Sequence, residues 1–383
     1  MDIAAFFKRA DWLDRERVRV YAAILALVSL ALLVGSYFAA MGPEGTDFLA
    51  FWGAGHVTSA GDPALAYDLA TQERVQTATG SEGWFAFVNP PPFLFIAAPF
   101  GALPFPLAWG LWVAVTFALW AFAAIRAFPR LWLLVLAYPG ALIAAGHGQT
   151  GLLTGALLVG AVALLDKRPL VSGALIGVLV IKPHLALLLP FWLAAGGRWK
   201  AFIAAGASAI GLLLASWAAF GTQTMLAYTT SWQASAALMA GDDPDFYLRM
   251  ATPYSQLRLI MPAQAALGVS VAIALGLLAL VLASWRRFGT DPLASGSLVL
   301  AASALASPYL FSYDLPFLIL PTLWLVREGL QRGFRDWEKV ALLALYLAPY
   351  ATRAAALPVG INLMPAASLL LLALVWTRIR EST

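Results

Sequence analysis

The stretch GTDFLAFWGAGH, residues 45–56, places the carboxylate of Asp47 among aromatic residues directly after an apolar run of membrane length. A carboxylate against apolar side chains is costly unless it is used or paired. Such a group suits a general base that takes a proton from a hydroxyl group. The alternative is a solvated loop acid, but the apolar neighbours favour the base. His56, at the end of this stretch, either contacts substrate or packs below it, and we favour packing.

Two further breaks between apolar segments carry polar groups. GHGQTG contains His147 and Gln149. It is either a tight turn between helices or a turn whose glycines leave room for these side chains to face a ligand. VIKPH places Lys182 and His184 on either side of a proline. A lysine at such a place usually extends its ammonium group to the membrane surface, whereas a phosphate partner would explain a cation at membrane depth.

A later break, SPYLFSYDLPF, holds Tyr309, Tyr313 and Asp314 between two prolines. It is either a kinked helix with interfacial tyrosines or a broken helix that lines a cavity and contacts substrate. Arg249 and Arg258 flank the end of a long polar segment. Guanidinium groups bind phosphate bidentately, so either arginine is a candidate for a lipid phosphate, and the alternative is simple solvation.

The usual motifs of metal and nucleotide chemistry are absent from the sequence. There is no H-E-x-x-H, no His/Cys cluster and no Walker or dinucleotide loop. Cysteine is also absent, which excludes a disulfide framework, an iron–sulfur site and a thiol nucleophile. We therefore expect no cofactor, no metal and no nucleic-acid partner. The alternative is an outward metal site, which would require the three scattered histidines to converge in space.

The composition indicates that these residues are positioned by membrane helices. Of the 383 residues, 61% are hydrophobic and 11% are charged, and the mean hydropathy is +0.80. Soluble domains have about 25% charged residues. Each membrane span needs about 20 residues, so we predict an all-α polytopic membrane protein with a single domain over residues 1–383.

Twelve apolar segments are candidate spans, several of them short. They are residues 18–41, 107–125, 131–146, 150–165, 170–182, 184–195, 199–219, 263–285, 295–311, 314–327, 338–353 and 358–377. The proline-flanked segment 92–105 is too short to span. We expect it to lie in a first outer loop, residues 42–106, that contains juxtamembrane helices. A second outer loop is predicted over residues 220–262.

The distribution of basic residues predicts the orientation. With segment 92–105 left out of the membrane, most of the 24 Lys and Arg residues fall in loops on one side, which the positive-inside rule assigns to the cytoplasm. Counting that segment as a span removes this bias. We therefore expect a multi-pass protein of the cell inner (plasma) membrane with both termini cytoplasmic. The breaks with chemical interest then all face the outer, periplasmic side.

The order and spacing of these motifs resemble glycosyltransferase family 87. They are DFLAFWGAGH, GDPALAYD, NPPPFLFIAAPFGALP, GHGQTGLL, VIKPHLALLLPFWL and SPYLFSYDL, and the resemblance covers residues from about 45 to 320. This family belongs to the GT-C superfamily and includes polyprenol-phosphate-mannose-dependent mannosyltransferases. The sequence NPPP departs slightly from the aromatic–Pro–Pro pattern of the family.

The resemblance implies a GT-C-type bundle and an inverting glycosyltransferase. A sugar, expected to be a hexose such as mannose, would move from a polyprenyl-phosphate donor to a hydroxyl of a lipid or glycan acceptor on the outer face. Asp47 matches the family's catalytic base. The candidate donor-phosphate ligands are Lys182, His184, Arg249 and Arg258, and the candidate substrate contacts are His56, His147, Gln149, Tyr309, Tyr313 and Asp314.

The competing class is a multi-spanning transporter or lipid flippase. Such proteins also use broken helices, but they more often show pseudo-repeated halves with polar groups along both. Here the unusual polar residues gather on one face, which favours an enzyme.

Overall fold

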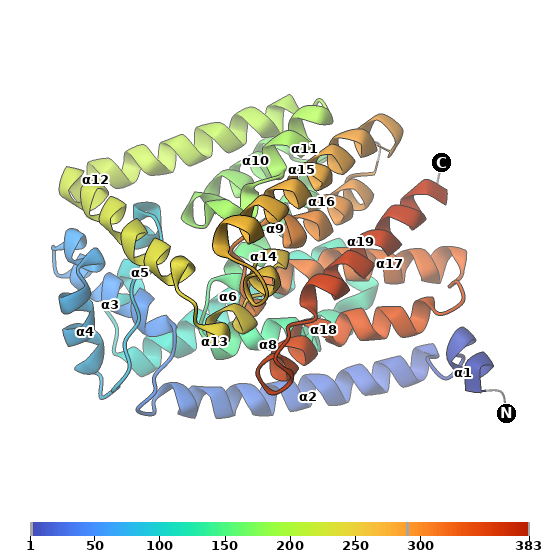
Figure 1. Ribbon diagram of the computed structural model, residues 1–383, viewed down its shortest axis with the longest axis horizontal. Coiled ribbons are helices and arrows are strands. Elements are labelled where there is room, and N and C mark those ends of the chain that lie inside the picture. Colours follow the sequence, from blue (N-terminus) through green and yellow to red (C-terminus); the bar gives the residue numbers. More distant parts are fainter. Residues whose placement is uncertain (1–2, 289–290, 382–383) are drawn as a thin grey trace.

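The computed structural model describes residues 3–288 and 291–381, and within them every regular element is helical (Figure 1). The only β-type pairing among these residues is an isolated bridge between Met250 and Phe311. The predicted all-α class is therefore confirmed, and the apolar helices are those of a membrane protein.

The helices differ widely in length. The long ones are α2 (Arg15–Ala40), α6 (Phe105–Ala127), α12 (Trp199–Ala240), α15 (Ala263–Phe288) and α18 (Glu338–Val359). The shorter α-helices are α1 (Ile3–Arg9), α3 (Phe48–Ser59), α4 (Leu69–Thr77), α5 (Leu94–Gly101), α7 (Trp132–Leu136), α8 (Pro139–Gly146), α9 (Gly151–Leu164), α10 (Pro169–Val178), α11 (Leu189–Ala195), α13 (Pro244–Arg249), α14 (Pro253–Arg258), α16 (Pro292–Ala306), α17 (Ile319–Arg332) and α19 (Met364–Glu381). The 3-10 helices are η1 (Pro63–Tyr67), η2 (Pro91–Phe93), η3 (Pro129–Leu131), η4 (Leu179–Ile181), η5 (Pro183–Ala186) and η6 (Ser312–Leu318).

Each of the twelve predicted apolar segments contains helix, but not all of them are long. Within the described residues, five helices are long and apolar enough to cross a bilayer. The number rises to six if the pair formed by 129–136 and 139–146, bent by 51°, counts as one span. The total of twelve spans stays a prediction.

Prolines cause the breaks that shorten several helices. Tyr138 precedes Pro139 and has an extended backbone (φ −68°, ψ 114°), because a following proline disfavours the helical conformation. Lys182 precedes Pro183 and is also non-helical (φ −151°, ψ 69°). The second break therefore separates η4 from η5 at a residue with a charged side chain.

The second outer loop is more helical than expected. The helix predicted to end near residue 219 continues as α12 to Ala240, with a kink at Gly221 (φ 78°, ψ 167°). Residues 222–240 contain no proline and no charged residue, so nothing in them stops a helix. The irregular part of the loop begins only after Ala240, and it holds the short helices α13 and α14.

The first outer loop also contains helices, and the longest of them is enclosed by protein. Nine of the twelve residues of α3 are buried, and α3 packs against α5, η1, α4 and α6. Figure 1 shows α3, α4 and α5 together at one end of the molecule, with both termini toward the other end. The interfacial position of these helices stays a prediction.

Candidate active site

Asp47 directly precedes α3, at the position where a capping side chain is expected. Its carboxylate makes no capping hydrogen bond. The hydroxyl of Thr46 serves that purpose instead and accepts a hydrogen bond from the backbone N–H of Phe48 at 3.0 Å. The same hydroxyl donates to the carbonyl of His147 at 3.1 Å. The Asp47 carboxylate is therefore free for another role, and 22% of its surface is exposed.

The turn between α8 and α9 lies against this carboxylate. Gln149 Nε2 donates to Asp47 Oδ2 at 3.1 Å, and His147 Nδ1 lies 3.7 Å from the same oxygen. The amide oxygen of Gln149 accepts from the backbone N–H of Thr150 at 3.3 Å, which orients the side chain. The structure thus brings together three of the residues that the sequence singled out.

Two glycines permit this close packing. Gly148 has a left-handed backbone (φ +60°), and a Cβ there would lie 2.7 Å from the Cβ of Phe48. A Cβ on Gly151 would lie 1.8 Å from the carbonyl oxygen of Tyr313. The turn therefore packs directly on both α3 and the backbone of η6. The rings of His147 and Tyr313 are 5.8 Å apart.

A buried ion pair joins this turn to the two proline-broken segments. The ammonium group of Lys182 forms a short contact with Asp314 and donates to the Thr150 hydroxyl at 3.2 Å. It also lies 5.3 Å from the centre of the Tyr313 ring. The other oxygen of Asp314 accepts from the backbone N–H of Phe311 at 3.1 Å. The charge of Lys182 is thus already compensated by a fully buried carboxylate.

Aromatic rings connect the remaining candidates. Tyr309 packs edge-on against His184 at 5.6 Å and against Phe311 at 5.4 Å. Phe311 stacks on Tyr313 at 5.0 Å. The Nε2 atom of His184 is buried and has no hydrogen-bond partner among the described residues.

Two arginines lie near the pair formed by Asp47 and His147. Arg249 is the last residue of α13, and Arg353 lies in α18, which packs against both α8 and α13. Both arginines act electrostatically on His147, and Arg353 also interacts with Asp47 and Arg249. Arg353 was not among the site residues predicted from the sequence. The sequence feature that could have identified it is an arginine within an apolar, membrane-length segment, where a charge is costly.

The structure does not bring two of the predicted residues to this site. His56 lies nine residues after Asp47, roughly 13 Å along the helix axis, where it stacks on Trp52 at 5.1 Å. Its Nδ1 atom lies 3.2 Å from the carbonyl oxygen of Gly101. Arg258 pairs with Asp242 at 2.7 Å and also bonds the hydroxyl of Tyr247.

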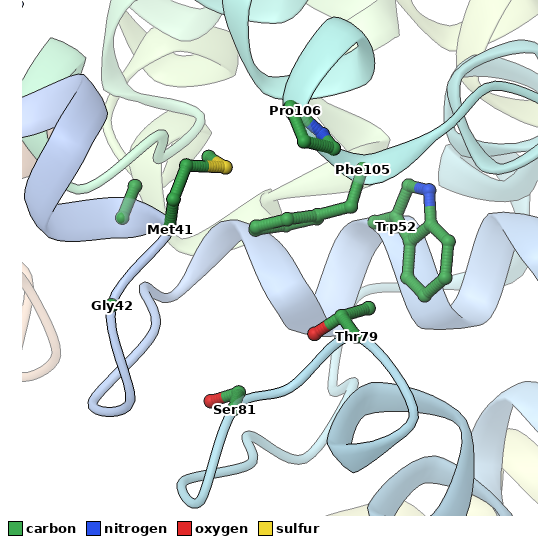
Figure 2. Close-up of a pocket in the computed structure, with 8 residues that line it drawn as sticks. Met41, Gly42, Trp52, Thr79, Ser81, Phe105 and Pro106 are labelled. Carbon is green, nitrogen blue, oxygen red and sulfur yellow. The ribbon is translucent and has the colours of Figure 1, made fainter.

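A cavity of about 300 Å³ lies beside the end of α2, α3 and the start of α6, and Figure 2 shows the residues that line it. Its lining is mainly apolar and consists of Ala40, Met41, Gly42, Trp52, Thr79, Ser81, Phe105 and Pro106. None of the predicted site residues lines it. Within the part of the chain that the structure describes, no three His, Asp or Glu side chains are grouped as metal ligands would be.

Comparison with known proteins identifies the family. No curated protein matches the chain, and no solved structure does. The family model "Glycosyltransferase family 87" matches residues 87–308, more than half of the chain. The matched part includes the turn around Gln149, the Lys182 break and Arg249. The chain therefore belongs to glycosyltransferase family 87.

Proposed function

We propose that this membrane glycosyltransferase transfers a sugar from a polyprenyl-phosphate donor to a hydroxyl group of a lipid or glycan acceptor, with inversion at the anomeric carbon. The resemblance to mannosyltransferases favours a hexose such as mannose. One observation carries the proposal: Asp47 is partly exposed, makes no cap, and is oriented by Gln149 beside His147.

The reaction needs one base and one stabilised leaving group. The acceptor oxygen attacks the anomeric carbon and forms the new glycosidic bond while Asp47 takes its proton. The bond between the anomeric carbon and the phosphate oxygen breaks, and the electron pair leaves with the polyprenyl phosphate. Phosphate needs little protonation to leave, so a single carboxylate suffices, in contrast to the paired acids of glycosidases.

The surrounding residues would orient the base and the substrates. Gln149 holds one carboxylate oxygen, which leaves the other to face the acceptor hydroxyl. His147, Tyr309 and Tyr313 offer rings and polar atoms to the sugar. We assign the Lys182–Asp314 pair to holding these segments together, because each charge already has its partner.

The contacts between loops support an outward-facing site. Segments predicted to lie outside contact one another: Thr46 bonds His147, and Asn89 Nδ2 donates to the carbonyl of Ile181 at 3.3 Å. Segments predicted to lie inside do the same at the other end, where Lys8 pairs with Asp336 at 3.1 Å. We propose that the first end faces the periplasm and the second the cytoplasm.

The donor class can be tested with purified protein in liposomes. Polyprenyl-phosphate hexoses and nucleotide hexoses would be offered in parallel with lipid acceptors, and the anomeric configuration of the product would be measured. The proposal predicts transfer from the polyprenyl donor alone, with inverted configuration. Transfer from nucleotide sugars alone, or retention of configuration, would refute it.

A further inference from the structure

The outer-side cations divide into those with a carboxylate partner and those without one. Lys182 pairs with Asp314, and Arg258 pairs with Asp242. Arg74, Arg249 and Arg353 form no ion pair with any described residue. Of these, Arg249 and Arg353 lie on α13 and α18, two helices that pack against each other, and their charges interact. Two guanidinium groups without an ion pair, on neighbouring helices, are suited to share one bound anion.

Side-chain hydrogen bonds hold the backbone at Arg249 and its two neighbours. Asn362, which is almost fully buried, donates from Nδ2 to the carbonyls of Leu248 and Met250, each at 3.0 Å. The hydroxyl of Ser312 donates to the carbonyl of Arg249 itself at 3.4 Å. The side chain of Arg249 is nevertheless exposed. This is a solvent-accessible cation on a rigid support, as preorganised ligand binding requires.

Arg353 is the second cation, and its position in an apolar helix is energetically unfavourable for a charge. It lies in α18, one of the five helices that are long and apolar enough to span a membrane. A charge there is expensive and usually has a functional partner. Within the described part of the chain, the carboxylate that interacts with it is that of Asp47, and the two form no ion pair.

We propose that Arg249 and Arg353 together form a clamp for the phosphate of an isoprenyl-phosphate donor. This inference rests on the proposed function and adds Arg353 to it. Guanidinium groups bind phosphate oxygens through paired, charge-assisted hydrogen bonds. Inversion places the attacking oxygen and the leaving phosphate on opposite sides of one carbon atom, so the phosphate site must lie close to the base. The clamp stabilises the negative charge that grows on the phosphate as the glycosidic bond to it breaks.

Binding can be measured without sugar transfer. Farnesyl phosphate would be titrated into the detergent-solubilised full-length protein, with farnesol as the uncharged control. We expect Arg249→Gln and Arg353→Gln each to weaken farnesyl phosphate binding by about tenfold or more. The double variant should bind farnesyl phosphate about as weakly as farnesol. Arg353→Lys should not restore full affinity, because an ammonium group lacks the paired donors.

Two controls separate this inference from the proposed function. Arg74→Gln removes an exposed arginine of the first outer loop and should bind like wild type. Asp47→Asn should lose no affinity, because it removes the base and a negative charge near Arg353 and leaves both arginines in place. If farnesyl phosphate binds as predicted but no polyprenyl donor supports transfer, the proposed function fails and the clamp stands.

Three results would overturn the clamp. The first is that wild type binds farnesyl phosphate no better than farnesol. The second is that the double variant keeps wild-type affinity while its melting temperature is unchanged. The third is that short-chain phosphatidic acid binds as tightly and is lost in the same variants, which would make the site a phospholipid headgroup site.

Discussion

His147 lies 3.7 Å from the Asp47 carboxylate, and its surroundings control its charge. The imidazole keeps 42% of its surface open, yet the protein surrounds it closely enough that burial lowers its pKa below the ordinary value. Asp47 opposes this shift, whereas the charges of Arg353 and Arg249 add to it. His147 is therefore neutral at neutral pH, so it does not form an ion pair with the Asp47 carboxylate.

This lowered pKa predicts how stability depends on pH. Between the folded-state pKa and about 6.5, the unfolded chain binds a proton at His147 that the folded protein does not. The free energy of unfolding should thus decrease as the pH falls through this window. His147→Asn should show a smaller loss of melting temperature between about pH 7 and pH 5. Equal losses in wild type and variant would contradict the assignment.

The buried pair of Lys182 and Asp314 predicts a large effect on stability. Lys182→Met leaves a fully buried carboxylate without its cation, which should lower the free energy of unfolding by about 3–5 kcal/mol. Lys182→Met should also raise the KM for the donor, because the site is distorted. Adding Asp314→Asn removes the unpaired charge, so the double variant should recover most of the lost stability and a donor KM close to that of wild type. Failure of the double variant to recover donor KM, with its stability restored, would assign Lys182 to the donor phosphate instead.

At the scale of residues, the sequence identified most of the side chains but not their partners. Asp47, Gln149 and Lys182 stood out because each is a polar residue in an apolar context. The sequence could not show that Lys182 pairs with Asp314, which is 132 residues away. Arg353 was overlooked because its place beside the site depends on the packing of α18 against α8 and α13, which come from elsewhere in the chain.

At the scale of elements, the turn between α8 and α9 depends on Gly151. An added Cβ would meet the backbone of Tyr313, and backbone cannot move aside as a flexible side chain can. Gly151→Ala should therefore lower both the melting temperature and the transfer rate. Gly110→Ala is the matched control, because nothing lies within 4 Å of its added Cβ, and it should be neutral or slightly stabilising. Equal effects of the two substitutions would show that this contact is unimportant.

The sequence predicted where helices occur better than where they end. Hydropathy located each apolar segment, and a proline indicated the break at Lys182, but the bend at Tyr138 inside segment 131–146 was not predicted. It did not predict that α12 continues beyond Gly221, since a glycine after an apolar run looks like a helix end. It also did not predict that α3 is enclosed by protein, because that depends on contacts with α5 and α6 from elsewhere in the chain.

At the scale of the whole molecule, the absence of cysteine makes the proposed orientation directly testable. A single cysteine can be introduced at Glu82, in the first outer loop, or at Gln331, at the end of α17. Both positions are exposed. In intact cells a membrane-impermeant maleimide should label the first variant and not the second. The reverse pattern would place the site on the cytoplasmic side.

The most direct test of the central claim is the turnover rate of Asp47→Asn. Asparagine keeps the shape of the side chain and an oxygen that can accept from Gln149, but it cannot take a proton. General-base catalysis contributes about 10²–10⁴-fold, so kcat should fall by at least about a hundredfold while the KM for the donor changes little. Asp62→Asn, an exposed acid of the same loop, should remain active. A kcat for Asp47→Asn within a few-fold of wild type would show that Asp47 is not the base.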